Sequence, residues 1–328
     1  MYAWQATTLD EPEKALSLVD MPTPEPGPGQ VLVRVLATAL NFPDVMLSRG
    51  QYQIKLDPPF VPGVEFCGEI VGLGPGVDQG DLLGARVVGN PVLPHGALAE
   101  YTLMTAAEAY AAPESLDDAE ASALHIAYQT AWFALHRRAR LAEGETVLVH
   151  AAAGGVGSAA VQLAKAAGAK VVGVVGGARK AEIARDLGAD LVIDRTSEGF
   201  IQAVKAFTGG RGADVVFDPV GGEAYTGSAR CVAFEGRIVV VGFAGGTIPA
   251  PPLNHALVKN YSILGLHWGL YRARDPEAVA ACHRELTRLA DAGTIKTLVG
   301  ARLPFEQAPA GLARLAAGEN LGRLVVVP

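Results

Sequence analysis

The stretch HAAAGGVGS, residues 150–158, joins two segments of different pattern. Before it, TVLVH at 146–150 is a short apolar run typical of a buried strand, and after it AAVQLAKAAGA at 159–169 has helical spacing. Glycines at such a junction let the backbone turn tightly and approach a ligand closely. The first N–H groups of the helix, together with its dipole, can then hold an anion. The stretch predicts a phosphate-binding turn, although glycines also open helices for packing alone.

The chain changes pattern near residue 120. The first 120 residues are rich in Pro and Gly and have short apolar runs, which favours a β-barrel or sandwich. Beyond them, strand and helix patterns alternate, and the apolar strands indicate a parallel sheet covered on both faces. Six such strands make a complete dinucleotide-binding fold. The last short runs, ending in GRLVVVP at 322–328, are expected to rejoin the first domain.

The glycine turn fits the dinucleotide fingerprint in detail. Gly154 takes the place of the glycine that lets a pyrophosphate approach, and Gly157 that of the glycine that lets helix pack on strand. Ala152 stands where the first glycine is usual. The predicted phosphate contacts are Ala153, Gly154, Gly155, Val156 and Gly157.

Composition excludes several classes of function. The chain has 328 residues, half of them hydrophobic, and a net charge of -7. It has no concentrated run of Lys and Arg, so we expect neither nucleic acid nor an anionic membrane as a partner. The three cysteines are too few and too scattered for a disulfide framework. The first residues lack the pattern of a secretory signal, and we expect a cytoplasmic protein.

Several motifs together resemble a known family. They are AAAGGVGSAAVQLAKAAGA (151–169), LGADLVID (187–194), GGRGADVVFDPVGG (209–222), GRIVVVGFAGG (236–246), ALNFPDVMLSRGQY (39–52) and PFVPGVEFCGEIVGLGPGV (59–77). The chain resembles the zinc-free NADPH:quinone oxidoreductase branch of the medium-chain dehydrogenase/reductase superfamily. The resemblance implies an α/β protein. It has a GroES-like β-barrel catalytic domain, 1–124 completed by 266–328, and a six-stranded parallel Rossmann domain, 125–265.

The residues at the family's zinc positions decide the branch. Zinc alcohol dehydrogenases of this superfamily carry Cys, His and Cys where this chain has Asn41, Val64 and a residue near Ala127. Catalytic zinc needs about three protein ligands. We therefore predict no metal. His95 and His125 are interpreted as core or pocket residues.

The choice of cofactor depends on the end of the second Rossmann strand. NAD-specific folds place an acidic residue there, whereas this chain has Gly176 and Gly177, followed by Arg179 and Lys180. By resemblance, Lys180 falls on the 2'-phosphate lysine of the family and Arg195 near the same phosphate. The cofactor predicted is NADPH. A solvated helix start is the alternative reading of Arg179 and Lys180.

Further cofactor contacts are implied by the resemblance. Gly242, Phe243 and Ala244 match the segment along the nicotinamide, Asn320 matches an asparagine that reaches the cofactor, and Asn41 lies beside the nicotinamide. Thr130 falls near the ribose, with capping of its own helix as the alternative.

The predicted function is hydride transfer from NADPH to a quinone or an enone in a cleft between the domains. The expected pocket walls are Tyr52, His125, Tyr128 and Trp268. Tyr52 also matches the tyrosine of 2-enoyl thioester reductases, so both Tyr52 and Asn41 are candidate catalytic residues. The alternatives are an enoyl thioester reductase and a non-catalytic NADPH-binding protein. The apolar edge YSILGLH (261–267) predicts a homodimer.

Overall fold

The computed structural model describes residues 1–78, 80 and 82–328. It contains two compact units, which are described separately: residues 1–126 with 283–328, and residues 127–282. Within the described part of the chain, no helix is both long and apolar enough to cross a membrane.

The second unit is built on a six-stranded parallel sheet in the order β10-β9-β8-β11-β12-β13. Its strands are β8 (Thr146–His150), β9 (Lys170–Val175), β10 (Leu191–Asp194), β11 (Ala213–Asp218), β12 (Val232–Val240) and β13 (Ser262–Gly265). Every residue of β8 is buried, as expected of a strand at the centre of a sheet covered on both faces. The predicted six-stranded Rossmann fold is confirmed.

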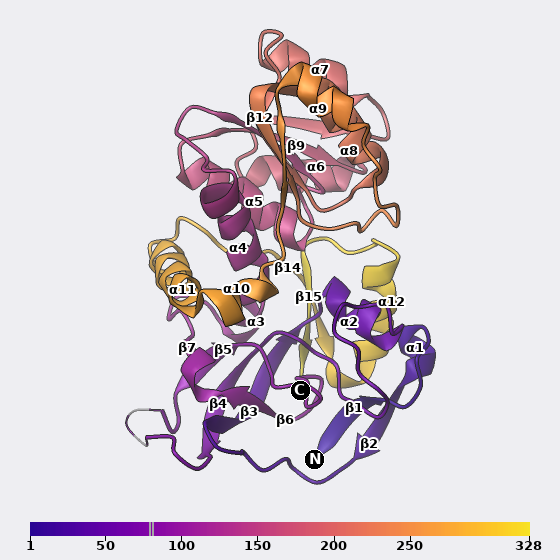
Figure 1. The fold of residues 1–328 in the computed structure, drawn as a ribbon. Helices are drawn as coiled ribbons and strands as arrows, with labels where there is room; N and C mark the ends of the chain where they lie inside the picture. The colour runs from indigo at the N-terminus through magenta and orange to yellow at the C-terminus, as the bar shows by residue number, and fades with distance from the viewer. Residues whose placement is uncertain (79, 81) are drawn as a thin grey trace. The chain divides into compact units, whose positions relative to one another are not determined.

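Helices cover both faces of this sheet, and their labels can be followed in Figure 1. They are α5 (Gly155–Ala166), α6 (Ala178–Asp186), α7 (Phe200–Phe207) and α8 (Gly222–Cys231). Helices α5 and α6 pack on β8, β9 and β10, whereas α7 and α8 pack on one another and reach β10, β11 and β12. The strand order reverses between β8 and β11. Such a reversal is the topological switch point at which open α/β sheets bind ligands.

The remaining elements assigned to the second unit are mostly helical. They are α4 (His125–Trp132) from Ala127 onward, η2 (Phe133–Arg138), α9 (Leu253–Lys259), α10 (Gly269–Arg274) and the first part of α11 (Pro276–Asp291). Packing places residues 266–282 in this unit: the Tyr271 and Phe133 rings lie 4.4 Å apart, and Arg137 pairs with Asp275 at 3.1 Å. The sequence analysis assigned residues 266–282 to the catalytic domain instead. The domain boundaries that it gave, at 124/125 and 265/266, stay a prediction.

The first unit is mainly antiparallel sheet, in agreement with the predicted GroES-like domain. A seven-stranded sheet has the order β14-β15-β3-β4-β5-β7 with β6 paired to β3, and β1 and β2 form a separate pair. Strand β15, from the end of the chain, pairs antiparallel with β3. The strands are β1 (Tyr2–Ala6), β2 (Leu16–Asp20), β3 (Gln30–Ala39), β4 (Phe66–Leu73), β5 (Arg86–Gly89), β6 (Tyr101–Thr105), β7 (Tyr110–Ala111), β14 (Val299–Pro304) and β15 (Arg323–Val327).

Short helices surround these strands. They are α1 (Pro12–Ala15), α2 (Phe42–Ser48), η1 (Ala106–Glu108), α3 (Asp118–Ser122), η3 (Phe305–Gln307) and α12 (Ala308–Ala316). One apolar core gathers Phe60, Leu98, Leu312 and Val326, which come from both ends of the chain. The end of the chain is therefore part of the first unit's core, and it brings its polar residues with it.

Candidate functional site

The glycine turn at the end of β8 is shaped by close packing on both sides. A Cβ on Gly157 would lie 2.1 Å from the Ala151 carbonyl oxygen, so only glycine lets α5 pack on this turn. Ala151 adopts the left-handed conformation, with φ 52°. Ala152 is buried, and a Cβ on Gly173 of β9 would lie 3.0 Å from its side chain. The neighbouring strand therefore supplies the room that permits alanine at the first position of the fingerprint.

The same turn leaves three backbone donors without a partner inside the helix at the start of α5. Gly154 is the N-cap residue, and the first intrahelical bond runs from Ser158 N–H to the Gly154 carbonyl at 2.9 Å. Within the part of the chain that the structure describes, no side chain caps this end. The N–H groups of residues 155–157 thus have no partner inside the helix and, with its dipole, suit an anion.

Asp194 organises the next strand end, at β9. Its Oδ1 atom accepts hydrogen bonds from Gly177 N–H (2.8 Å), Thr196 N–H (3.0 Å) and Thr196 Oγ1 (2.7 Å). These bonds, that from Gly177 first, hold the pKa of Asp194 below its ordinary value. An ionised carboxylate therefore fastens the end of β10 to the turn before α6. The sequence reasoning missed this residue, although it ends the LGADLVID motif.

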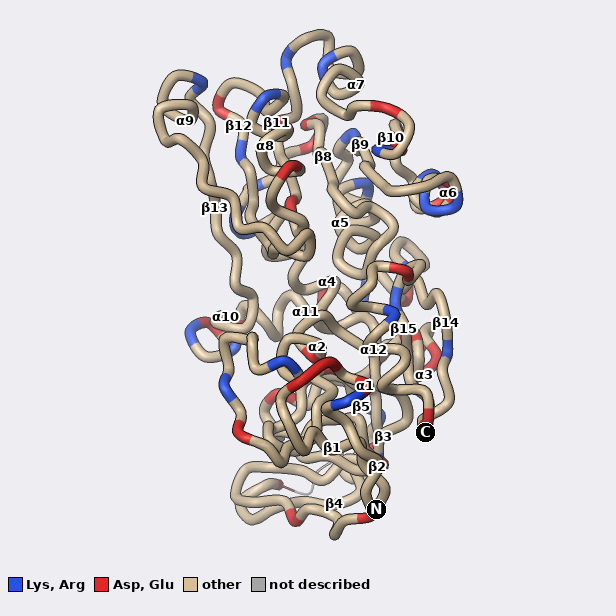
Figure 2. The backbone as a smooth tube through the Cα atoms, turned by 90° about the vertical axis from the view of Figure 1, so that its right-hand side faces the viewer, with Lys and Arg blue, Asp and Glu red and all other residues tan. Residues whose placement is uncertain are grey.

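Basic side chains lie around the same turn. The guanidinium of Arg195 covers Gly176, where an added Cβ would lie 3.3 Å from its nearest nitrogen, whereas a Cβ on Gly177 would meet no atom within 4 Å. Lys180 is half-buried and Arg179 is exposed, both on α6; Figure 2 marks the Lys and Arg positions of α6 in blue. Arg195 and Gly176 therefore lie side by side, and the open space is at Gly177.

The turn after β11 supports the segment predicted to follow the nicotinamide. Asp218 Oδ1 accepts from Val220 and Gly221 N–H, each at 2.9 Å, and Ala244 N–H donates to the Pro219 carbonyl at 3.0 Å. Residues 242–244 are therefore hydrogen-bonded to the turn at 219–221, which the Asp218 carboxylate stabilises. Asp218 Oδ2 is buried and has no hydrogen-bond partner among the described residues. Sequence reasoning missed Asp218, although its DPVGG context is a turn signal.

His150 ends β8 and is a second buried polar residue that the sequence reasoning passed over. Its Nε2 atom lies 2.7 Å from Ser228 Oγ, and its ring packs edge-on against Phe200. Burial lowers the pKa of His150 to about 4, against a raising effect of Asp218. His150 is therefore neutral at pH 7, and its hydrogen bond ties β8 to α8.

Three predicted residues of the second unit are associated with α4. Thr130 is buried, Tyr128 is fully buried with its hydroxyl accepting from Gln162 Nε2 at 2.8 Å, and Trp268 donates to Gln129 Oε1 at 3.2 Å. The structure thus brings Trp268 to α4. Tyr128 contributes to the contact between α4 and α5.

A buried polar cluster surrounds Asn41 in the first unit. Asn41 Nδ2 donates to the Ala39 carbonyl at 3.0 Å and to Glu65 Oε2 at 2.8 Å. Glu65 also pairs with Arg323, and its Oε1 accepts from Ile126 N–H at 2.6 Å. Burial raises the pKa of Glu65, and Arg323 acts against that change. The sequence singled out Asn41 but not Arg323, which lies 258 residues from Glu65 along the chain.

Asp44 fixes the loop opposite Asn41. Its Oδ1 accepts from Gly63 (2.9 Å) and Val64 (3.0 Å) N–H, and its Oδ2 accepts from Asn41 N–H at 2.8 Å. Burial raises the pKa of Asp44 to about 6, although these three donors lower it. Asp44 therefore holds together the two loops that carry the family's zinc positions.

The other predicted residues of the first unit, Tyr52, His125 and Asn320, each have different neighbours. Tyr52 is half-buried against the apolar core that contains Phe60. His125 Nε2 lies 3.2 Å from Asn90 Oδ1, and its ring stacks on Tyr110 at 5.4 Å. Asn320 Nδ2 donates to the Gly322 carbonyl at 2.7 Å.

The strand ends of the second unit fit a dinucleotide. Added Cβ atoms on Gly154 and Gly242 would meet protein atoms no closer than 3.1 and 3.4 Å, and one on Gly177 would meet none. Glycine backbone without side chains therefore follows the carboxyl ends of β8, β9 and β12. The first N–H groups of α5 lie after β8, and the Arg195 guanidinium lies beside the turn after β9. Over residues 1–78, 80 and 82–328, no group of three or more His, Cys, Asp or Glu side chains is placed to hold a metal.

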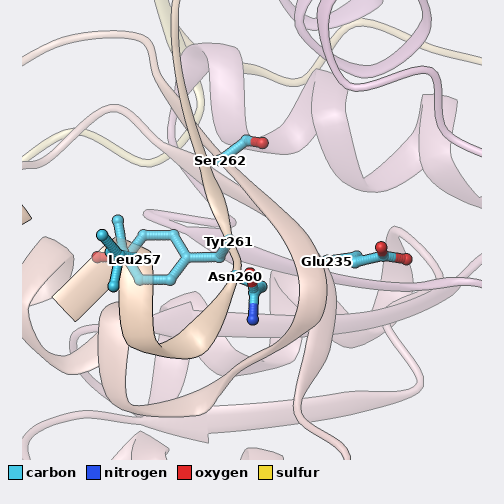
Figure 3. Close-up of a pocket in the computed structure, with 6 residues that line it drawn as sticks. Glu235, Leu257, Asn260, Tyr261 and Ser262 are labelled. Atoms are coloured by element: carbon cyan, nitrogen blue, oxygen red, sulfur yellow. The ribbon is translucent and has the colours of Figure 1, made fainter. Parts of the chain in front are cut away.

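A surface hollow of about 580 Å³ lies elsewhere, at the free edge of the sheet. It is lined by residues of β12, α9, β13 and the link between α9 and β13 (Figure 3): Glu235, Ala256, Leu257, Asn260, Tyr261 and Ser262. It does not include the glycine turn, so it is not the dinucleotide seat.

Two family models match the chain. The alcohol dehydrogenase GroES-like domain matches residues 27–114, and the zinc-binding dehydrogenase model matches residues 155–284. The second match begins inside the glycine turn, at Gly155, and contains the ends of β9, β10, β11, β12 and β13.

Individual relatives extend the match to the whole chain. Quinone oxidoreductase-like protein 2 of Bos taurus is 35% identical over 314 residues, which are 94% of this chain and 88% of that protein. The Escherichia coli quinone oxidoreductase, solved in complex with NADPH, is 28% identical with a TM-score of 0.91 and full coverage of both chains. A mycocerosic acid synthase-like polyketide synthase of Mycobacterium tuberculosis is 32% identical over 305 residues, 92% of this chain but 14% of that protein. The chain therefore belongs to the zinc-free quinone oxidoreductase branch of the medium-chain dehydrogenase/reductase superfamily.

Proposed function

We propose that the protein is an NADPH-dependent reductase that transfers hydride to quinones or other conjugated carbonyl acceptors without zinc. The observation that carries the proposal is the path of bare backbone along the strand ends of the second unit. It begins at the first N–H groups of α5, which have no partner inside the helix, and reaches the basic turn of Gly176 and Arg195. That order of features suits a pyrophosphate and a 2'-phosphate.

The chain's own residues bind and orient the cofactor. Backbone N–H groups of 155–157 would hold the pyrophosphate, and Lys180 and Arg195 would neutralise the 2'-phosphate. Phe243 and Ala244 would border the nicotinamide, on the turn that Asp218 stabilises. When bound, NADPH supplies the hydride. The protein's part is to hold the acceptor in register and to limit the access of water.

The zinc positions support a reaction that depends on cofactor and acceptor alone. Asn41 uses both of its amide hydrogens within the protein, and Val64 has no ligating atom. Catalytic zinc in this superfamily would need about three ligands. The residues present do not fit that metal.

A reductase of enoyl thioesters is the second candidate. Two observations favour it: the half-buried Tyr52, and the match to part of a polyketide synthase. An enone that gains hydride must also gain a proton, which Tyr52 could supply, whereas a reduced quinone can take its proton from water. The two candidates therefore differ in how much they depend on Tyr52.

A homodimer through the free edge of β13 also belongs to the proposal. Strand β13 ends the sheet, and beside it α9 exposes Leu253, Leu257 and Val258 by 73, 76 and 73%. A soluble protein must cover such an edge or pair it. A second copy would pair β13 with β13 and fill the hollow beside Tyr261.

A panel of acceptors tests the proposal. Steady-state oxidation of NADPH and of NADH is measured with a benzoquinone, a cyclic enone and a crotonyl thioester, each against the rate without protein. We expect quinone-dependent turnover with NADPH and a much lower kcat/KM with NADH. Turnover with the thioester but not the quinone would favour the second candidate, and no turnover with any acceptor would leave a non-catalytic NADPH-binding protein.

A further inference from the structure

Two aspartates fasten strand β10 to strand β9, one at each end. At the amino end, Asp190 Oδ2 accepts a hydrogen bond from Val171 N–H at 2.7 Å. At the carboxyl end, Asp194 Oδ1 accepts one from Gly177 N–H at 2.8 Å. The two strands pair in parallel, and both are labelled in Figure 2. Parallel sheets of this kind bind ligands outside their carboxyl ends, so only Asp194 lies at the edge where a ligand is expected.

Asp194 also closes a tight turn around Arg195. Its Oδ1 atom accepts from Thr196 N–H (3.0 Å) and Thr196 Oγ1 (2.7 Å), and its backbone carbonyl accepts from the N–H groups of residues 197–198, each at 3.0 Å. Arg195 N–H donates to the Val175 carbonyl at 2.9 Å. The backbone is therefore bonded on both sides of Arg195, which fixes the direction in which its side chain leaves the turn.

The Arg195 guanidinium rests against Gly176. A Cβ on Gly176 would lie 3.3 Å from Nη2, 3.4 Å from Nε and 3.6 Å from Cζ of Arg195. Residue 176 ends the second Rossmann strand, where NAD-specific folds place an acidic side chain. The guanidinium thus occupies space that a side chain at this position would need, and open space lies at Gly177 beside it.

An arginine held in this way is prepared for a phosphate. Ordering a long side chain when a ligand binds costs free energy, and a side chain that is already ordered avoids that cost. Helix α6, which carries Lys180, is anchored separately by its buried residues Ala181 and Ala184. Asp194 therefore acts on Arg195 rather than on Lys180.

We propose that Asp194 is a positioning residue for the choice of cofactor. Through Oδ1 it holds Arg195 against Gly176, in the orientation that receives the 2'-phosphate of NADPH, and it thereby strengthens the preference for NADPH over NADH. This inference rests on the proposed function, because it takes Arg195 as a ligand of that phosphate. The competing explanation is that Asp194 stabilises the fold alone, as Asp190 does.

Substitution by alanine and by asparagine separates the acceptor atom from the charge. Oδ2 of Asp194 accepts no hydrogen bond from the described residues, so asparagine can keep all three bonds at Oδ1. Both substitutions remove one negative charge. The Kd of Asp194→Ala divided by the Kd of Asp194→Asn therefore measures the effect of the acceptor.

This ratio is measured with NADPH and with NADH by fluorescence titration, after thermal unfolding has shown that both variants fold. We expect a ratio of about 2 to 10 for NADPH, the cost of ordering one arginine side chain. For NADH, which lacks the 2'-phosphate, the ratio should stay near one. Equal ratios for the two cofactors, or a ratio of one for NADPH, would assign Asp194 a structural role and overturn the proposal.

Two controls test whether the effect passes through Arg195. In protein that also carries Arg195→Ala, the ratio for NADPH should fall to one, because no guanidinium remains to be positioned. The matched pair Asp190→Ala and Asp190→Asn removes the fastening at the other end of the strand, and its ratio should be one for both cofactors. A ratio that persists without Arg195, or that appears equally at Asp190, would contradict the inference.

A measurement on the wild type covers the case in which Asp194→Ala does not fold. The Nε–H group of Arg195, followed by NMR relaxation in nitrogen-labelled protein, should be ordered before any cofactor is added. The exposed Arg185 of α6 serves as the mobile control. An Arg195 side chain as mobile as that of Arg185 in the free protein would overturn the proposal.

Failure of the inference can be told from failure of the proposed function. All of these measurements report binding or order and need no turnover, whereas quinone-dependent oxidation of NADPH by the wild type tests the function itself. Turnover combined with equal ratios for NADPH and NADH rejects only the inference. Absence of NADPH binding in the wild type rejects both.

Discussion

Gly154 and Gly157 lie three residues apart, and their substitution by alanine should have opposite consequences. A Cβ on Gly157 would lie 2.1 Å from the Ala151 oxygen and 2.7 Å from its carbonyl carbon, so α5 and the turn must separate by more than an ångström. Both groups are backbone, and the cost should reach the upper end of overpacking, about 3 kcal/mol. Gly157→Ala should then lower the Tm by about 6 to 12 °C.

Gly154→Ala meets almost no protein. Its Cβ would lie 3.1 Å from the Ala151 oxygen, and the only other heavy atom within 4 Å is at 3.8 Å. The unfolding free energy should change by about 1 kcal/mol or less, the difference between Gly and Ala at an N-cap. The methyl group would instead stand where the pyrophosphate must approach. Losing one charge-assisted hydrogen bond should raise the Kd of NADPH by about 10- to 150-fold.

Thermal unfolding and fluorescence titration with NADPH measure the two effects on the same samples. Wild-type NADPH affinity in Gly154→Ala would refute the assignment of this turn to the pyrophosphate. A wild-type Tm in Gly157→Ala would refute the packing argument.

Five further substitutions have defined outcomes. Lys180→Ala and Arg195→Ala should each raise the Kd of NADPH by about 3- to 10-fold, after solvent screening, and leave that of NADH unchanged in the same titration. Tyr52→Phe should slow enone reduction by about 10²- to 10⁴-fold and quinone reduction little; equal losses in kcat would leave Tyr52 as a pocket wall. Burial raises the pKa of Asp44 from 3.8 to about 6, so the folded chain binds a proton that the unfolded chain releases. The free energy of unfolding should therefore fall by about 3 kcal/mol as pH rises across that range, and urea titrations of Asp44→Asn should lack this slope. Leu257→Asp should give a monomer by light scattering, whereas a wild type that is already monomeric would contradict the edge pairing.

Local patterns were enough to predict the fold of the second unit. Its strands are mostly apolar runs, and the glycine turn joins strand to helix within nine residues. The spacing of apolar residues therefore predicted the strands and helices, and the glycines predicted the turn between them. Arg195 and Gly176 could be placed together because the family's motifs surround them. The sequence analysis placed residues 266–282 in the first unit, whereas their contacts place them in the second. The contacts of Tyr271 and Asp275 with η2 leave no periodic signal in the sequence.

The residues that support the site were not predictable in the same way. Glu65 and Arg323 meet only because β15 returns to β3 from the other end of the chain. Asp194 and Asp218 end strands and bond to turns beyond them, which requires the strand order and the register. Their role is to accept backbone N–H groups, and an aspartate in a turn gives the same sequence signal whether or not a ligand lies beside it.

A single turnover of the bound cofactor tests the central proposal most directly. Protein dialysed against a chelator is loaded with NADPH and mixed with excess quinone, and the absorbance of the reduced nicotinamide is followed. We predict complete loss of that absorbance, faster than in a protein-free control, and slower when C4 carries deuterium on the transferred face. Bound NADPH whose absorbance stays constant in the presence of quinone and enone alike would contradict hydride transfer by this protein.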